Sequence, residues 1–348
     1  MKVLCLTEGR LIPSTRFRVL QYLPYLKERG IEVDVKYFRD DSYPIGIGMT
    51  GPRRYLVAGR DLFRRCLDIL SAPRYDVVIL QRETVPWKTD LLDRVLTRLS
   101  PRLILDIDDA IYLSPSGRPD RVHRVQRLLS RARMATVANR TLQTFAQPWA
   151  RTALIPMAVD TDRYVLKKRA AENGKVRIGW CGSATNLPYL EMLRAVLLRL
   201  LRRGQVEFLL ITGGYSPRVL DGVPFIHKRW TEETELASLA EIDIGLLPLV
   251  EGAQAKGKFP IKLLQYMALG IPTVASPIGV VPEVIEHGVN GFLARTNIEW
   301  EEQIVRLIED KTLRQQIGEA SAKTVVERYS VQAVLPSLVR AIQQVSRS

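Results

Sequence analysis

Short apolar runs that alternate with helical patterns constrain the fold of this chain more than any other feature. One such run covers residues 2–7, and after a helical pattern a second run covers 31–37. A strand, a helix and a strand at this spacing predict a parallel βαβ unit. The cycle continues with apolar runs at 76–81, 102–106 and 133–138. We therefore expect an α/β fold that begins with a Rossmann-like sheet.

A polar stretch at 167–175, KKRAAENGK, interrupts this alternation, and a second cycle begins with a strand pattern at 176–180. The length of 348 residues suits two domains, each able to bury its own core. Later strands are expected at 207–212, 224–227, 242–248 and 273–275. We predict an N-terminal Rossmann-like domain over 1–165, a C-terminal Rossmann-like domain over 166–330 and a final helical segment over 331–348.

Helical patterns fill the intervals between these strands. They are expected at 16–29, 88–99, from about 188, from about 260 and over 313–345. A further short helix should follow the turn at 277–281 and contain Glu283 and Glu286.

The segment 257–293, GKFPIKLLQYMALGIPTVASPIGVVPEVIEHGVNGFL, carries the strongest functional signal. Pro260 suits the first position of a helix, and the apolar residues after it have helical spacing up to Gly270. The first N–H groups of a helix lack intrahelical partners and carry the positive end of its dipole, so a diphosphate is stabilised there. Lys258 and Lys262 would add positive charge. The segment therefore predicts a nucleotide-sugar site.

This block resembles the donor-binding half of the retaining glycosyltransferases of family 4, and the resemblance extends over nearly the whole chain. It implies the GT-B fold, in which two Rossmann-like domains face each other and a C-terminal helix returns to the first domain. Members commonly carry two glutamates here, one near the donor sugar and one on the ribose hydroxyls; this chain has Gly257 and Gln265. PIKLLQYMA is also similar to a PxKxxEYMA variant of the motif.

The small polar loop after the strand pattern at 176–180 would let a phosphate approach the backbone closely. Taken alone this loop is unspecific, and it gains meaning from its place at the start of the second cycle. Together with the resemblance, these patterns predict donor binding by Gly182, Ser183, Asn186, Lys258, Gln265 and Glu283, and a catalytic role for Lys262 on the leaving phosphate.

Three carboxylates within four residues, Asp106, Asp108 and Asp109, stand at the end of the strand pattern at 102–106. Such a cluster is costly unless it is solvated, paired or functional. The resemblance places a histidine or a pair of aspartates at this strand end, so we expect Asp108 and Asp109 to be catalytic and to orient the acceptor. Arg82 is their expected ion-pair partner. The alternative is a helix N-cap with a surface charge.

Arginines after the first strand complete the predicted acceptor site. Arg16 and Arg18 are expected to face an acceptor phosphate beside Arg82, and the alternative is a structural role in loop closure. The loop that follows residue 7 lacks the GxGxxG pattern, which argues against a nicotinamide cofactor. The resemblance implies no cofactor and no metal, because GT-B enzymes do not use the metal-binding DxD signature. Three cysteines without a CxxC pair predict reduced thiols.

The net charge of +14 is concentrated in the first half of the chain. Arg60, Arg64 and Arg65 alternate there with Phe63 and Leu67, a basic amphipathic pattern suited to an anionic membrane surface. The alternative is a solvated helix face. Nucleic acid is not expected, because no recognised module or aromatic interleaving accompanies the charge. Without a signal peptide or a long apolar run, the expected location is the cytoplasm, peripheral to the membrane.

These patterns together predict a glycosyltransferase that moves a sugar from a nucleoside diphosphate sugar to an acceptor hydroxyl with retention. The expected acceptor is a sugar or a lipid-linked molecule in envelope or surface polysaccharide or glycolipid synthesis. A non-catalytic protein that binds a nucleotide or a partner is the first alternative, because Gly257 and Gln265 depart from the family pattern. A nucleotide-sugar epimerase on the same fold is the second.

Overall fold

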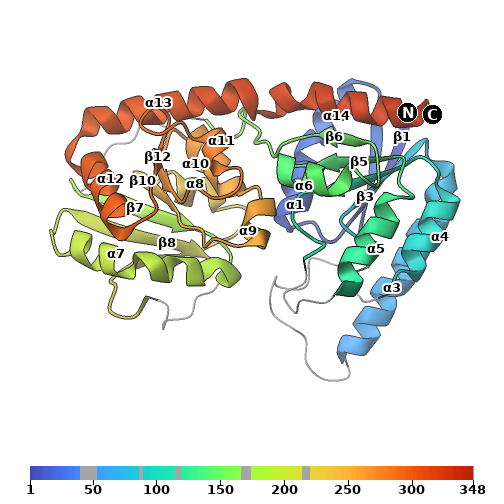
Figure 1. Cartoon of the computed structure of the whole chain (residues 1–348), viewed down its shortest axis with the longest axis horizontal. Helices are drawn as coiled ribbons and strands as arrows, with labels where there is room; N and C mark the ends of the chain where they lie inside the picture. Colours follow the sequence, from blue (N-terminus) through green and yellow to red (C-terminus); the bar gives the residue numbers. More distant parts are fainter. Residues whose placement is uncertain (40–52, 86–88, 114–118, 166–173, 214–219, 348) are drawn as a thin grey trace. The chain divides into compact units, whose positions relative to one another are not determined.

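The computed structural model describes residues 1–39, 53–85, 89–113, 119–165, 174–213 and 220–347. The chain forms two compact units (Figure 1). Unit 1 comprises Met1–Ala158, Gly257–Phe259 and Val331–Ser348, and unit 2 comprises Val159–Lys256 and Pro260–Ser330. The predicted boundary at residue 165 falls inside unit 2, and the final segment from residue 331 lies in unit 1.

Unit 1 is built on a six-stranded parallel sheet with the order β2-β1-β3-β4-β5-β6. The central strands are buried on both faces, which explains why their sequences are almost continuously apolar. The strands are β1 (Lys2–Thr7), β2 (Glu32–Tyr37), β3 (Val77–Gln81), β4 (Leu103–Ile107), β5 (Met134–Val137) and β6 (Thr152–Leu154).

Helices cover this sheet, and the last helix of the chain is among them. Val331, Leu335 and Ile342 of α14 belong to the same core as Val3 and Ile79 of the sheet. The helices are α1 (Pro13–Arg18), α2 (Leu23–Glu28), α3 (Arg53–Ser71), α4 (Leu91–Leu99), α5 (Pro119–Leu129), α6 (Arg140–Ala146) and α14 (Val331–Ser346), with short 3-10 helices at Leu20–Tyr22 and Ala72–Arg74.

The helix predicted at 16–29 is wrong as a single element. Two short helices and a 3-10 turn occupy this stretch, because the chain leaves helical geometry at Val19. Pro13 and Pro24 each stand in the first turn of one helix. A proline has no N–H to bond to the preceding turn, so Pro24 begins a helix where a continuous one would need a donor.

Unit 2 is built on a second six-stranded parallel sheet, with the order β12-β11-β10-β7-β8-β9. Its core joins apolar residues of the sheet, such as Ile178 and Phe208, to Trp300 and Ile304 of a covering helix. The strands are β7 (Val176–Cys181), β8 (Val206–Thr212), β9 (Ile226–Arg229), β10 (Ile244–Leu247), β11 (Thr273–Ala275) and β12 (Phe292–Leu293).

The helices of unit 2 begin with a 3-10 helix, η3 (Ala184–Leu193), where the sequence predicts an α-helix from about residue 188. Pro188 lies inside this 3-10 segment. The α-helices are α7 (Arg194–Leu201), α8 (Glu235–Leu239), α9 (Ala253–Gly257), α10 (Ile261–Ala268), α11 (Val281–Val284), α12 (Asn297–Glu309) and α13 (Lys311–Arg328). Because α11 ends at Val284, Glu286 lies outside the helix predicted to contain it.

The strand orders locate the place in each sheet where a ligand can bind. In open parallel sheets, ligands bind beyond the carboxyl ends of the strands, at the point where the order of connection reverses. In unit 1 this point lies between β1 and β3, and in unit 2 it lies between β7 and β10. We therefore examined the residues that follow these strands.

Candidate functional site

Charged residues follow the central strands of unit 1. Arg82 directly follows β3 and lies at a φ of 65°, in the left-handed region where a side chain other than that of glycine is strained. Asp106 lies within β4, and Asp108 and Asp109 directly follow this strand. The register of these two strands pairs Gln81 with Asp106, so the loops begin beside each other.

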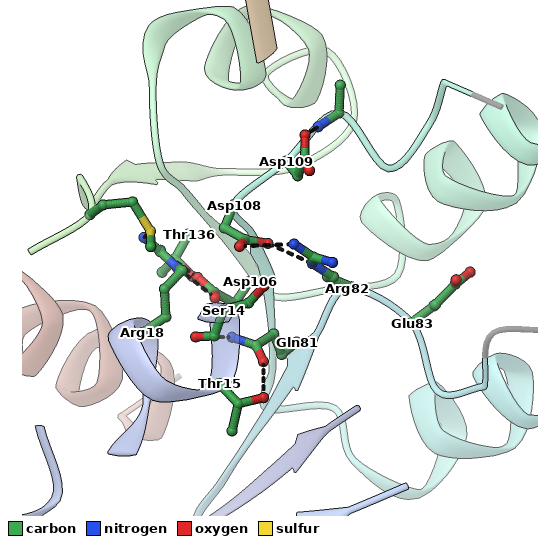
Figure 2. A network of polar contacts seen from close by, with 12 residues as sticks. Ser14, Thr15, Arg18, Gln81, Arg82, Glu83, Asp106, Asp108, Asp109 and Thr136 are labelled. Atoms are coloured by element: carbon green, nitrogen blue, oxygen red, sulfur yellow. Dashed lines mark hydrogen bonds and ion pairs between the residues drawn. The ribbon is translucent and has the colours of Figure 1, made fainter. Parts of the chain in front are cut away.

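The ion pair predicted between Arg82 and Asp108 is present. Nε of Arg82 donates to one carboxylate oxygen at 2.7 Å and Nη2 donates to the other at 3.0 Å (Figure 2). Burial acts to raise the pKa of Asp108, but the charge and hydrogen bonds of Arg82 hold it below its ordinary value. Asp108 is therefore ionised at neutral pH, with both oxygens bonded to Arg82.

A second ion pair lies deeper in unit 1 and joins Arg18 to Asp106. The Arg18 guanidinium donates to both oxygens of Asp106, at 2.7 and 2.5 Å, and Thr136 donates to one of them at 2.6 Å. Another Arg18 nitrogen donates to the carbonyl of Ile155 at 2.8 Å. The Arg18 side chain is only 4% exposed. This geometry matches the structural alternative for Arg18 and gives no support to a contact with acceptor phosphate.

The other charged residues predicted in this region lie in different surroundings. Arg16 is buried, with its guanidinium over the ring of Phe17. Asp109 is partly exposed, accepts a hydrogen bond from the N–H of Ala110 and is directed away from the Arg82–Asp108 pair in Figure 2. Lys258 belongs to unit 1; burial lowers its pKa, and the nearby charge of Asp109 opposes this effect.

A cavity of about 190 Å³ opens at the switch point of unit 1. Its walls combine acidic, basic and amide side chains with one aromatic ring, Phe38. Inside it, Arg121 donates to Glu83 at 3.1 Å. The lining residues are Glu8, Phe38, Gln81, Arg82, Glu83, Thr84, Ile111 and Arg121. Carboxylates and amides accept hydrogen bonds from hydroxyls, and the ring offers an apolar face.

The loop at the switch point of unit 2 is small and uncharged. Gly182 follows β7, and a Cβ on this residue would lie 2.5 Å from the ring of Trp180, so only glycine fits there. The exposed hydroxyls of Ser183 and Thr185 are 2.8 Å apart, and the N–H of Asn186 bonds the carbonyl of Ser183. Backbone can therefore approach a ligand closely at this point.

Lys262 lies near this loop, in the first turn of α10. The helix is fixed to the end of β7, because the N–H of Cys181 donates to the hydroxyl of Tyr266 at 2.7 Å. Lys262 Nζ donates to Oε1 of Glu235 at 2.7 Å, and the Glu235 side chain is 1% exposed. Burial acts to lower the pKa of Lys262, but the charges of Cys181 and Glu235 raise it above its ordinary value.

Gln265, one turn further along α10, is fully buried. Its Nε2 donates to the hydroxyl of Tyr164 at 2.5 Å, and that hydroxyl lies 3.4 Å from Oε2 of Glu235. Oε1 of Gln265 has no hydrogen-bond partner in the described part of the chain. The side chain predicted to contact ribose thus extends the Lys262–Glu235 network.

Gly257 and Glu283, two other residues of the sequence motif, lie in different surroundings. A Cβ at Gly257 would lie 2.6 Å from the Cβ of Ala110, so a glutamate does not fit at this position without movement. The carbonyl of Gly257 accepts a hydrogen bond from Asn139 at 2.9 Å. Glu283 lies exposed in the first turn of α11.

Sequence reasoning missed Glu235 and Tyr164. Trp230 Nε1 donates to Oε1 of Glu235 at 3.0 Å, the same oxygen that bonds Lys262. Glu235 stands in the polar run TEETELASL, where its neighbours are also acidic and no spacing separates it from them. Glu235 is buried at the start of α8 by residues that are distant in the sequence, so no local pattern predicts its burial. Among the described residues, no group of three or more His, Cys, Asp or Glu is placed to hold a metal.

The same architecture occurs in known proteins. Sucrose-phosphate synthase from Thermosynechococcus elongatus superposes with a TM-score of 0.76 at 15% identity, over 99% of each chain. Anabaena HepE, solved in complex with UDP and glucose, superposes with a TM-score of 0.70 at 17% identity, over 99% of this chain and 100% of that one. At this identity the likeness concerns the fold. Two Rossmann-like units that superpose on these structures define a protein with the GT-B fold.

The sequence comparisons identify the family. Residues 175–310 match the group 1 glycosyl transferases. N-acetyl-alpha-D-glucosaminyl L-malate synthase of Bacillus anthracis is 31% identical over 84 residues, which cover 23% of this chain and 22% of that protein. Amylovoran biosynthesis glycosyltransferase AmsK of Erwinia amylovora is 44% identical over 57 residues, 16% of this chain and 14% of that one. Each match spans less than a quarter of the relative's length.

Residues 175–310, within the part of the chain that forms most of unit 2, are therefore similar to group 1 glycosyltransferases. The predicted family and the predicted GT-B fold are both confirmed.

Proposed function

We propose that this protein is a retaining glycosyltransferase that moves a sugar from a nucleoside diphosphate sugar to an acceptor hydroxyl. The observation that carries the proposal is the position of Lys262 beside the carboxyl end of β7, where α10 begins and the strand order of unit 2 reverses. HepE was solved in complex with UDP and glucose and with UDP-glucose, which supports the same class of donor here.

The donor diphosphate would be held by three features of unit 2. The Lys262 ammonium has three N–H donors and gives one to Glu235, so two remain for phosphate oxygens. The first N–H groups of α10 add the positive end of a helix dipole. The loop after β7 can add the backbone N–H of Ser183, since the N–H of Gly182 already bonds the carbonyl of Ile211 at 3.1 Å. Because Lys262 is paired with Glu235, the net positive charge of this site is small. The binding of a diphosphate would therefore depend more on where the donors lie than on the total charge.

These groups act on the leaving group of the reaction. As the bond between sugar and phosphate breaks, negative charge grows on the diphosphate, and a fixed ammonium and fixed N–H groups stabilise this charge more in the transition state than in the ground state. The departing phosphate is a base that can accept the proton of the acceptor hydroxyl. We propose this front-face route with retention, since the residues of this site that the structure describes include no pair of carboxylates arranged as glycoside hydrolases use them.

The acceptor would bind in the cavity of unit 1. Glu8, Gln81 and Glu83 can accept hydrogen bonds from sugar hydroxyls, and Arg121 can donate one. Glu8 and Glu83 offset the charges of Arg82 and Arg121 in the lining, so the cavity has little net charge to attract a phosphate. Of the two predicted catalytic aspartates, Asp109 is the better candidate for orienting the acceptor, because both oxygens of Asp108 are bonded to Arg82.

A second candidate function is binding without turnover, and two observations favour it. Gln265 is buried against Tyr164 and Glu235, and Gly257 packs against Ala110 where a carboxylate would not fit. A protein with this site could bind a nucleotide and leave the sugar untouched. No comparable observation favours an epimerase.

The test is a panel of UDP-, GDP-, ADP- and TDP-sugars, with thermal unfolding and release of sugar measured on the purified full chain, without added metal and with magnesium. A transferase should be stabilised by one donor and should hydrolyse it slowly when no acceptor is present. Stabilisation without any release, even with candidate glycan and lipid-linked acceptors, would point to the binding function. An unaltered melting curve with every donor would remove the proposed donor site.

We further propose a place for this activity, in polysaccharide or glycolipid assembly at the cytoplasmic face of a membrane. Support comes from the excess positive charge in the first half of the sequence and from AmsK, whose name refers to amylovoran biosynthesis. Among the described residues, no helix is long and apolar enough to span a bilayer.

A further inference from the structure

The helix α3 turns an apolar stripe toward solvent. Leu56, Phe63, Leu67 and Leu70 follow one another at intervals of seven, four and three residues, which places them on one face of a helix. They are 77%, 65%, 52% and 62% exposed. We call these four residues the α3 stripe. An isolated exposed leucine is ordinary, but an aligned set on one helix marks an interaction surface.

The opposite face of α3 carries the contacts that fix the helix to unit 1. Arg65 is 1% exposed, and its Nη2 donates to the carbonyl of Thr7 at 2.5 Å, at the end of β1. Its guanidinium also lies over the ring of Phe38. Asp61 and Ile69 are buried on the same side. The helix is therefore anchored by polar and apolar contacts that leave the α3 stripe outside.

This arrangement corrects one part of the sequence prediction. Arg65 was expected to face a membrane together with Arg60 and Arg64, but it lies in the core of unit 1. Burial lowers the pKa of Arg65 to about 10, and the charge of Asp68 opposes this effect. The Arg65 side chain packs on the buried face of α3. Of the three arginines, only Arg60 and Arg64 therefore place their charges at the surface.

Arg60 and Arg64 border the α3 stripe on one side. Each is one turn from a member of the stripe, at positions i+4 from Leu56 and i−3 from Leu67. Both are exposed, and Arg60 also bonds Asp61. A helix with an apolar stripe and arginines at its edge matches the boundary of an anionic bilayer, where apolar side chains enter the acyl region and guanidinium groups bond lipid phosphates.

We infer that α3 docks this protein onto an anionic lipid surface, with the helix axis in the plane of the membrane and the α3 stripe inserted below the headgroups. The inference is independent of the proposed transferase activity, because neither α3 nor its stripe belongs to either candidate ligand site. In Figure 1, α3 lies beside α4, and the two helices pack together in unit 1. Docking through α3 would bring unit 1 to the bilayer surface.

A second copy of the chain fits the stripe less well. In a symmetric pair, the same face of α3 is presented by both copies. Arg60 and Arg64 of each copy would then border the contact, and the α3 face has no exposed acidic residue to meet them. Repulsion between like charges disfavours such a pair. An anionic surface has the complementary sign.

The inference is tested by sedimentation of the full chain with vesicles of phosphatidylcholine alone and of phosphatidylcholine mixed with phosphatidylglycerol. We expect the wild type to bind the mixed vesicles. Phe63→Ser/Leu67→Ser should bind them with an affinity lower by roughly tenfold or more, because two inserted apolar side chains are replaced by polar ones. The matched control is Ile298→Ser on α12, an exposed apolar side chain outside the stripe, which should bind like the wild type. Thermal unfolding of each variant checks that the fold is kept.

Charge is tested separately. Arg60→Glu/Arg64→Glu should weaken binding to mixed vesicles about thirtyfold, since each basic residue near the surface contributes roughly 1 kcal/mol. Arg140→Glu/Arg202→Glu, exposed arginines at the start of α6 and just after α7, serve as the control of equal net charge. Equal losses in both charge variants, or undiminished binding of folded Phe63→Ser/Leu67→Ser, would overturn the inference. So would a wild-type dimer that the stripe variant converts to a monomer while vesicle binding stays unchanged.

Discussion

The carboxyl edges of the two sheets differ in how they use charge. In unit 1 the edge carries two arginine–aspartate pairs, Arg18–Asp106 and Arg82–Asp108, whose members bond each other at two points. In unit 2 the edge carries a loop of small residues and a single lysine–glutamate pair, in which Lys262 keeps unused donors.

This difference in charge indicates which kind of ligand each edge can bind. Paired charges shape the walls of a cavity and leave little net charge for a ligand, so unit 1 suits a neutral polyhydroxyl molecule. An open loop beside a lysine with spare donors suits an anion.

The largest expected effect is on stability, from Asp106→Ala. This change leaves the Arg18 guanidinium buried without its carboxylate, which costs about 3–5 kcal/mol. Urea unfolding followed by circular dichroism measures it. Asp221→Ala, at an exposed site, should change stability by less than about 0.5 kcal/mol. If Asp106→Ala unfolds like the control, the pair is not a stabilising part of unit 1.

The next effect is on turnover, from Lys262→Ala. Loss of the ammonium should lower turnover by roughly 10² or more, because the growing charge on the leaving diphosphate loses its partner. Single-turnover sugar release measures it, with Lys323→Ala as the exposed control. Because Glu235 is left buried without its lysine, the melting temperature is measured alongside. A stable variant with unchanged turnover would take Lys262 out of the donor site.

A smaller effect is expected on nucleotide affinity, from Gly182→Ala. The new Cβ would lie 2.5 Å from the Trp180 ring, so the loop or the ring must move. We expect the dissociation constant for the donor nucleotide to rise about tenfold, a loss comparable to one hydrogen bond to a charged group. Gly213→Ala, after β8, is the matched control, since a Cβ there meets no atom within 4 Å. Equal affinities of the two variants would contradict phosphate binding by the Gly182 loop.

The smallest effect concerns Asp108→Asn and depends on pH. The pKa of Asp108 lies below its ordinary value of 3.8, so the ionised form stabilises the fold above that pH, and this contribution is lost as the pH falls through the lowered pKa. The variant should be less stable by about 1 kcal/mol at neutral pH, because an amide bonds Arg82 less strongly. Urea midpoints at a series of pH values should converge below pH 3.8. A difference that grows toward acid would reverse the sign and refute the pairing.

Periodicity and strand spacing were enough to predict five strands of each sheet, because apolar runs in parallel sheets are dictated by burial on two faces. The short edge strands β6 and β12 were not predicted. The break at Pro24 was visible in the sequence, but the helical pattern around it concealed the change of geometry at Val19. Motif spacing also located Lys262 correctly at the start of α10.

The partners of the site residues were beyond the reach of local patterns. Lys262 meets Glu235 and Gln265 meets Tyr164 across separations of 27 and 101 residues. Arg18 was predicted to face an acceptor phosphate and Arg65 an anionic membrane surface, whereas both are buried by contacts that only the folded unit provides. The Arg82–Asp108 pair was predictable because both residues stand at the ends of adjacent parallel strands.

The left-handed backbone of Arg82 sets opposing demands on one position. Its conformation would be relieved by glycine, while its two bonds to Asp108 require a forked, permanently charged side chain, which lysine cannot imitate. Glycine would relieve the backbone strain but lose the bidentate contact. Any other residue would lose the contact and keep the strain. In a scan of all amino acids along 81–84, position 82 should be the least permissive, a signature of a residue retained against its own conformational preference.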